Sequence, residues 1–281
     1  MKKIISLLTI LLSAVLFSYN SFANQTTQNN TAQYQCPMKC EGEKTYDKPG
    51  SCPMCKMDLK KVAEKNTNKT KTSSVRVVGA MMNVMHKGEL FGTMDIDTIK
   101  NKNHLYGLGP VEYLKGELMI IDGKSYKSTV AADDSIAMEE TFKAKAPFFV
   151  YANVDKWKEI FLPDSVQSIP QLESFLDQTT KNHSRPFAFR LTADIDHCEI
   201  HIVNQPKGVE VHSPDDVQKK SFDVKNEKAE LLGFFSTEHK GVFTHHDSFV
   251  HIHILTADKK KMGHADKLMM KKGTVKLYIQ E

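Results

Sequence analysis

Three histidines near the C-terminal end of the chain have the residue type and spacing of a metal site. His251 and His253 are two residues apart, and His264 follows eleven residues after His253. On an extended strand, side chains two apart point to the same face, so the first two could hold one ion together. The Thr256–Gly263 connection is long enough to return His264 from a neighbouring strand as a third ligand. Three histidines leave a tetrahedral zinc ion with an open position, as in catalytic zinc sites.

The alternative to a metal site is an ordinary strand on which the imidazoles of His251 and His253 are exposed. The chain has twelve histidines, so some pairs at this spacing arise by chance. His264 follows Gly263 and is followed by Asp266, and these neighbours favour a metal site over a chance pair of histidines.

A second group with chemical potential is a cluster of four cysteines near the N-terminus: Cys36, Cys40, Cys52 and Cys55. Two close pairs about a dozen residues apart are typical of a tetrahedral thiolate metal site. Three methionines among them suit copper(I) as well as zinc(II), so both metals stay open. Two structural disulfides are the alternative, because exported proteins meet an oxidising environment. The lone Cys198 is predicted to be a buried or half-buried thiol without chemistry.

The elements that must position these groups are mostly strands, with a few helices. Asp122-Gly123 between apolar runs is a strong signal for a two-residue hairpin, and it places Glu117, Met119 and Ile121 on one strand face. Alternation of apolar and polar residues predicts further strands over Phe187–Leu191, Val250–Leu255 and Thr274–Ile279.

One helix is predicted to begin near Ser168. Ser168 can cap it, Pro170 suits its first turn, and Gln171 completes a capping box. Its inward stripe is formed by Leu172, Phe175, Leu176 and Thr179.

The beginning of the chain has the features of an export signal. Lys2 and Lys3 supply the charged start, Ile4–Phe17 the apolar stretch, and Ser21-Phe22-Ala23 a cleavage site. No later segment is long and apolar enough to span a membrane. We therefore expect a soluble protein that is periplasmic or secreted.

Composition divides the chain into five predicted segments: a signal peptide (1–23), a flexible leader (24–33), the cysteine module (34–61), a linker (62–74) and a globular domain (75–281). The formal charge is +4, and removal of Lys2 and Lys3 with the signal lowers it to about +2. This near balance gives no indication of a nucleic-acid partner. A phosphate-binding glycine loop is not seen, so no nucleotide or thiamine cofactor is indicated.

The segment Tyr34–Leu59 resembles the small heavy-metal-binding domain attached to bacterial metal-efflux proteins. The resemblance lies in Lys48-Pro49-Gly50-Ser51-Cys52-Pro53-Met54-Cys55-Lys56-Met57-Asp58-Leu59. Where the usual pattern has His-Pro after Cys-Pro-Met, this chain has Lys39-Cys40, which adds a thiolate and favours a four-cysteine site.

The segment Val75–Gln280 resembles the α-acetolactate decarboxylases, which are zinc-dependent carboxy-lyases of acetoin biosynthesis. Matching motifs occur in order along the domain: Gly88-Glu89-Leu90-Phe91-Gly92, Gly107-Leu108-Gly109, Leu114-Lys115-Gly116-Glu117-Leu118, Ile121-Asp122-Gly123-Lys124-Ser125-Tyr126, Phe187-Ala188-Phe189-Arg190 and the three histidines. The resemblance implies an α/β (α+β) fold with two mainly antiparallel or mixed sheets and a few helices, beside a small zinc-ribbon-like cysteine module.

Carried over residue by residue, the resemblance implies that His251, His253 and His264 ligate zinc(II). It places Glu117 at the family's active-site glutamate and Arg190 at the arginine that faces the metal. Decarboxylation of a β-keto acid leaves negative charge on the ketone oxygen, which a zinc ion can stabilise. A guanidinium can bind a carboxylate through two parallel hydrogen bonds. A glutamate can ligate the metal or hold a proton.

These features predict an exported enzyme that converts 2-acetolactate, or a close 2-hydroxy-3-oxo acid, to acetoin. The alternative is a catalytically inactive periplasmic metal-handling protein. The cysteine module favours this alternative. Family members usually extend past the last strand and supply a second carboxylate from that extension, whereas this chain ends at Glu281, which favours the alternative too. His245, His246 and Asp247 could enter the site, although a solvated loop is favoured for them. A homodimer stays open.

Overall fold

The computed structural model describes residues 32–36, 44–53, 58–62 and 75–281 of the chain. The predicted signal peptide, Cys40, Cys55 and most of the leader and linker lie outside the described residues. A small antiparallel sheet of order β2-β1-β3 forms the N-terminal module. Its strands are β1 (Tyr34–Gln35), β2 (Thr45–Tyr46) and β3 (Lys60–Lys61).

The rest of the described chain is built around two six-stranded antiparallel sheets, as expected. The first sheet has the order β4-β11-β6-β7-β8-β9. Its strands are β4 (Arg76–Gly79), β6 (Leu105–Pro110), β7 (Glu117–Ile121), β8 (Lys124–Val130), β9 (Ile136–Glu140) and β11 (Phe148–Asn153). A two-stranded ribbon of β5 (Met94–Asp95) and β10 (Lys145–Ala146) accompanies it.

The predicted hairpin at Asp122-Gly123 is confirmed as the turn between β7 and β8. Both residues have positive φ angles, 45° and 76°, as a two-residue hairpin turn of this kind requires. Met119 packs in the apolar layer between the sheets, and Leu118 packs on the opposite face of β7. Because side chains alternate along a strand, Glu117 points the same way as Met119, toward the second sheet.

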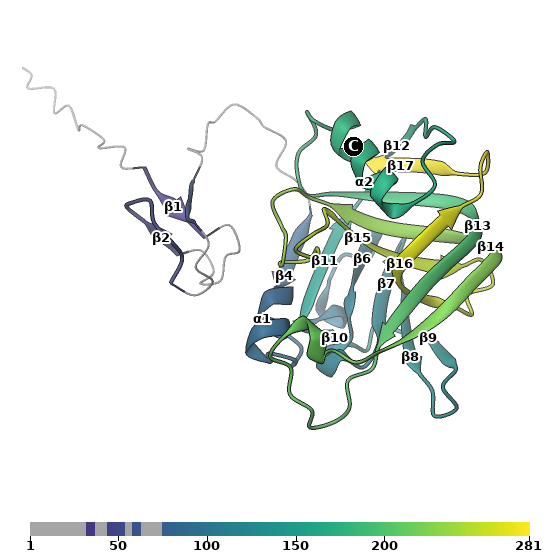
Figure 1. Cartoon of the computed structure of the whole chain (residues 1–281), viewed down its shortest axis with the longest axis horizontal. Coiled ribbons are helices and arrows are strands. Elements are labelled where there is room, and N and C mark those ends of the chain that lie inside the picture. The colour runs from purple at the N-terminus through teal and green to yellow at the C-terminus, as the bar shows by residue number, and fades with distance from the viewer. Residues whose placement is uncertain (1–31, 37–43, 54–57, 63–74) are drawn as a thin grey trace, which may run out of the picture.

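The second sheet has the order β12-β17-β13-β14-β15-β16, and a further pairing of β13 with β16 closes part of it on itself. Its strands are β12 (Trp157–Ile160), β13 (Phe187–Val203), β14 (Lys219–Phe235), β15 (Val250–Thr256), β16 (Met262–Met270) and β17 (Lys276–Gln280). The two long strands β13 and β14 run as a bent ribbon along the domain (Figure 1).

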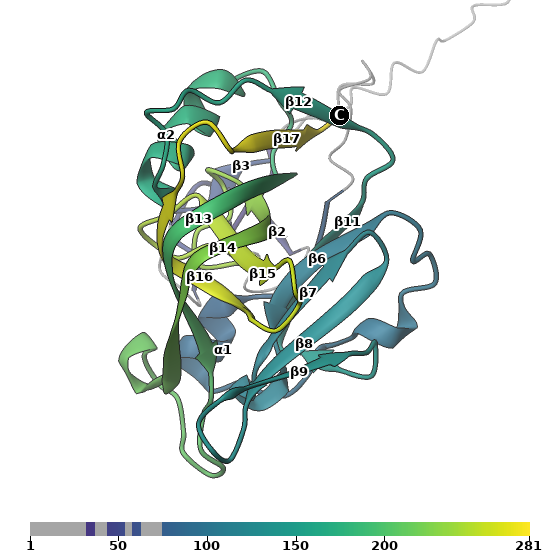
Figure 2. The ribbon, with the colours of Figure 1, turned by 90° about the vertical axis from the view of Figure 1, so that its right-hand side faces the viewer.

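The two sheets lie as layers against each other (Figure 2). Met119 and Tyr126 of the first sheet share one apolar cluster with Leu232 and Phe234 of the second. A separate core on the other side of the second sheet contains Phe187, Phe189, Leu191 and the buried face of α2. The space between the two sheets is therefore a buried, mainly apolar layer that can enclose a polar site.

Helices are few: α1 (Met81–Lys87), α2 (Ile169–Thr179) and the short 3₁₀ turns Ile96–Thr98, Glu112–Leu114 and Pro214–Asp216. The capping box predicted at Ser168 is present at the start of α2. Leu172 and Leu176 are buried and Phe175 packs against the core, but Thr179 is exposed and Thr180 is buried in its place. No helix in the described part of the chain has the length and apolar character that a membrane crossing needs.

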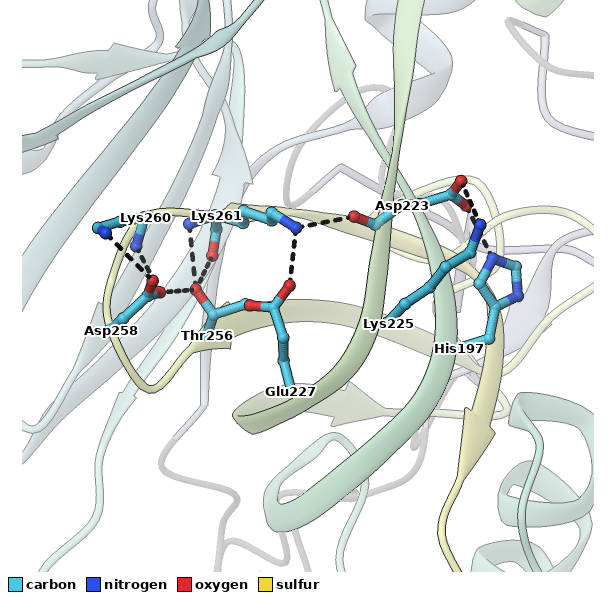
Figure 3. Close-up of polar contacts among 8 residues, drawn as sticks. All are labelled: His197, Asp223, Lys225, Glu227, Thr256, Asp258, Lys260 and Lys261. Atoms are coloured by element: carbon cyan, nitrogen blue, oxygen red, sulfur yellow. Dashed lines mark hydrogen bonds and ion pairs between the residues drawn. The ribbon is translucent and has the colours of Figure 1, made fainter.

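Polar contacts fix the turn that joins β15 to β16 (Figure 3). The Thr256 hydroxyl donates to Asp258 Oδ1 at 2.7 Å and accepts from the Lys261 N–H at 3.1 Å. Lys261 Nζ then donates to Glu227 Oε1 at 2.7 Å and to the Asp223 carbonyl oxygen at 3.1 Å, both on β14. These contacts stabilise the hairpin whose register determines which residues of β15 and β16 meet.

Candidate metal centre

The three histidines predicted from their spacing come together between the sheets. His251 and His253 share a face of β15 with Leu255, which packs in the layer between the sheets. His264 on β16 lies opposite His253 in the strand register. All three are buried, and one potential ligand atom from each lies within 4.8 Å of the others. The group could therefore hold a metal ion.

The protonation of these imidazoles suits a cation. His253 Nδ1 lies 3.0 Å from the Leu118 carbonyl oxygen of β7, which can only accept, so this nitrogen carries the proton. His253 Nε2 then presents its lone pair 3.2 Å from His251 Nε2. Burial lowers the pKa of His253 to about 3 and lowers the pKa of His251 and His264 well below the ordinary value. Neutral histidines with one oriented nitrogen fit a zinc(II) ion.

Gly263 is required by the path of β16. A Cβ atom built on Gly263 would lie 2.7 Å from the His201 carbonyl oxygen and 3.3 Å from Ile200 Cδ1. β16 thus passes β13 too closely for a side chain at this position. The glycine before His264 therefore allows the strand approach that places this third ligand.

Glu117 also lies at this centre. Its side chain is buried, with Oε2 3.6 Å from His253 Nε2 and Oε1 accepting from the Val203 N–H at 3.2 Å. Burial raises the pKa of Glu117 well above its ordinary value, which favours the neutral carboxyl. The structure therefore brings the predicted glutamate to the predicted ligands.

A cavity of about 450 Å³ opens beside Glu117, His251 and His264. Its apolar wall comes from α1, β11 and the segments around them, and includes Met81, Met85, Leu114, Phe148, Val203 and Val217. His245 and His246 are solvent-exposed, as expected for their loop, and they also line this cavity. A small molecule could lie here with one end at the histidines and the rest against apolar side chains.

Arg190 is not among the described residues that line this cavity. Its Nη1 lies 3.2 Å from Glu230 Oε1, and its guanidinium packs over the rings of Tyr278 (4.6 Å) and Trp157 (5.5 Å). An arginine held by a carboxylate and two aromatic rings stabilises the second sheet. Its predicted role as carboxylate clamp stays a prediction that this placement does not support.

Three more polar residues, with no role predicted from the sequence, adjoin the site. His201 of β13 is buried, lies with its ring 4.7 Å from that of His264, and has Nδ1 2.8 Å from both Asp266 oxygens. Lys219 Nζ lies 3.5 Å from Asp266 Oδ2. The sequence had marked Asp266, two residues after His264, and the structure brings its carboxylate to His201.

The cysteine module is described only in part. Cys36 and Cys52 are both buried and belong to one apolar cluster, while Cys40 and Cys55 lie outside the described residues. Metal binding by the four cysteines, with zinc or copper, stays a prediction. Cys198 is buried as expected, and burial raises the pKa of its thiol to about 12, which keeps it protonated and unreactive.

Fold and site together define a two-sheet antiparallel β protein with a buried trihistidine group facing an apolar cavity. The chain belongs to the alpha-acetolactate decarboxylase family, whose model matches residues 78–281. Residues 33–62 match the heavy metal binding domain.

Solved structures with the same fold include two acetolactate decarboxylases, from Bacillus subtilis subspecies spizizenii and from Bacillus subtilis strain 168. They are 17% and 18% identical with TM-scores of 0.60 and 0.59, each covering 74% of this chain and 86% of the other. A Staphylococcus aureus protein of unknown function, described as similar to alpha-acetolactate decarboxylase, is 16% identical with a TM-score of 0.55 and covers 73% of this chain and 84% of the other. No curated protein sequence matches the chain.

Proposed function

We propose that this chain decarboxylates 2-acetolactate, or a close 2-hydroxy-3-oxo acid, to acetoin and carbon dioxide. The zinc(II) ion of this reaction would be held by His251, His253 and His264. The observation that carries the proposal is the buried trihistidine group at the wall of a cavity, in a chain whose residues 78–281 belong to the decarboxylase family. Three protein ligands leave room for a substrate on the cavity side.

The protein's own groups account for the rest of the chemistry. When bound, zinc supplies a Lewis acid that stabilises the charge developing on the ketone oxygen as the carbon–carbon bond breaks. The apolar side chains of the cavity wall lower the local polarity beside the histidines, which strengthens charge interactions there. Glu117 either completes the ligand set or gives its proton to the carbon that has lost carbon dioxide.

The test is an acetoin assay on the zinc-loaded full chain with 2-acetolactate. His253→Ala should abolish acetoin formation with the fold retained in circular dichroism. His197→Ala is the matched control, because the side chain of His197 is partly exposed on β13 and contacts Asp223 instead. Absence of acetoin from the zinc-loaded wild type would overturn the proposal.

We also propose export, from the charged start, apolar stretch and cleavage signal of residues 1–23. The mature protein should begin at Asn24 and occur in the periplasm or medium. Mass spectrometry of the N-terminus from fractionated cells tests this, and an intact Met1 in the cytoplasmic fraction would contradict it.

A second candidate function is metal handling without turnover. The heavy metal binding domain match at residues 33–62 favours it. This function predicts exchangeable zinc or copper that is lost in Cys36→Ser/Cys52→Ser, together with no acetoin from the wild type. The decarboxylase proposal instead predicts turnover that persists in the double variant once the histidine centre holds zinc.

A further inference from the structure

The lysine or arginine that lines the cavity is Lys219, whereas the sequence had pointed to Arg190. Of the described residues that line it, Lys219 is the one lysine or arginine, and the other ionisable lining groups are histidines and Glu117. Arg190 is engaged by Glu230 and by two aromatic rings outside the cavity. Lys219 is therefore the lysine side chain that an anionic substrate can meet among the described residues of the cavity wall.

The strand register places Lys219 at the wall that holds Glu117. Lys219 begins β14 and is paired with Val203 of β13, whose N–H donates to Glu117 Oε1. Backbone pairing thus determines which side of the cavity the lysine reaches.

The contacts of Lys219 hold it near the site but leave its donors available. Nζ lies 3.5 Å from Asp266 Oδ2 and 3.5 Å from His201 Nδ1. Both distances are long for a hydrogen bond, and Asp266 takes its short bonds, 2.8 Å, from His201. The Lys219 side chain is 46% exposed. An ammonium group with three donors and loose partners can turn toward a bound anion.

The lysine also lies at a suitable place relative to the candidate ligands. The His201 ring lies against His264, with ring centroids 4.7 Å apart and planes inclined by 33°. Lys219 is therefore one imidazole ring away from the trihistidine group. A 2-hydroxy-3-oxo acid carries its carboxylate on the carbon that bears the hydroxyl. Such a molecule can present oxygens to the histidine centre and its carboxylate to the lysine.

We propose that Lys219 binds the substrate carboxylate in this cavity, with Asp266 and His201 positioning its ammonium group. This inference rests on the proposed decarboxylase function. Decarboxylation converts the carboxylate into neutral carbon dioxide, so the ion pair is stronger with the substrate than in the transition state. Removal of the ammonium should therefore raise KM and leave kcat nearly unchanged.

Steady-state kinetics on the zinc-loaded full chain provide the first test. Lys219→Met should raise KM for 2-acetolactate roughly tenfold and change kcat by less than about threefold, as expected for one charge-assisted contact at a partly exposed site. Lys219→Arg should restore most of the affinity. Lys220→Met is the matched control, because Lys220 is the next residue on β14 and its Nζ bonds to Asp134. An unchanged KM in Lys219→Met would overturn the inference while leaving the proposed function intact.

Calorimetric binding makes the test independent of turnover. The probes are 2-hydroxyisobutyrate, which carries a carboxylate, and its neutral methyl ester. The wild type and Lys220→Met should bind the acid about tenfold more tightly than the ester, and Lys219→Met should lose this preference. If the wild type forms no acetoin yet shows this lysine-dependent preference, the proposed function fails and the carboxylate site stands. No preference for the acid in the wild type, or an undiminished one in Lys219→Met, would overturn the inference.

Discussion

His253 on β15 lies directly opposite His264 on β16, at the open end of a hairpin whose turn is held by Thr256 and Lys261. The two ligands belong to neighbouring antiparallel strands, so their meeting depends on one register. A slip by a single residue would turn His264 to the opposite face of the sheet. The Leu118 carbonyl oxygen of the other sheet then orients the His253 ring. The candidate centre is thus built by one hairpin and one contact across the layers.

His264→Ala should remove the metal from this centre. The variant retains two of three imidazoles, which lowers zinc affinity by orders of magnitude, because each ligand contributes strongly in such sites. Elemental analysis after dialysis should show one zinc ion fewer per chain than in the wild type. His197→Ala should match the wild type, since His197 lies partly exposed beside Asp223. Equal zinc content in wild type and His264→Ala would contradict the assignment of this ligand.

Gly263→Ala should both destabilise the fold and weaken metal binding. The new Cβ would meet the His201 carbonyl oxygen at 2.7 Å, so β16 must move away from β13. Overpacking of this kind costs about 1–3 kcal/mol. Urea unfolding of the metal-free protein measures the loss, and zinc titration measures the affinity. Wild-type values in both measurements would show that the strand approach does not depend on glycine.

Glu117→Gln should make the metal-free protein more stable at alkaline pH. Burial raises the pKa of Glu117 well above 4.5 in the folded state. The contribution of its neutral carboxyl to the free energy of unfolding is therefore complete below pH 4.5 and is lost as the pH rises through the pKa of the folded state. Glutamine stays neutral and can still accept from the Val203 N–H. The advantage of the variant should grow by up to about 1.4 kcal/mol per pH unit between the two pKa values. Chemical denaturation at pH 4.5, 6 and 8 tests this, and a constant difference would contradict it.

Acid should destabilise the metal-free protein through the buried histidines. Burial holds the pKa of His253 at about 3 and the pKa of His251 and His264 well below 6.5. The unfolded chain takes up protons below pH 6.5 that the folded chain does not, so stability falls as the pH drops from 6.5 toward 3. Each histidine contributes up to about 1.4 kcal/mol per pH unit. His253→Gln should show a shallower slope in denaturation curves, whereas an equal slope would show that His253 titrates normally when folded.

Much of the frame could be predicted from local patterns. Alternation along Val250–Leu255 places His251 and His253 on the face that also carries Leu255, and Asp122-Gly123 marks the hairpin that aims Glu117. The capping box at Ser168 depends on neighbouring residues alone, and α2 begins there as predicted. These features are local, because a strand's period and a turn's backbone angles are set within a few residues.

The identity of the lysine at the cavity wall, Lys219, was decided by tertiary structure. The register of β13 against β16 shifts between Ile195 and His197 and again between Glu199 and Ile200. Such irregularities break simple alternation, so the face on which His201 lies could not be inferred from the residues around Arg190.

Sequence alone determined the histidine pair, the glutamate and the family to which this domain belongs, since short-range spacing and ordered motifs carry that information. The partners of Arg190 and Lys219 were decided only by folding. Trp157, Glu230 and Tyr278 surround the arginine from three separate strands, and Asp266 reaches the lysine from a fourth. Contacts between residues far apart in the chain depend on how sheets close and layers pack, which no local pattern specifies.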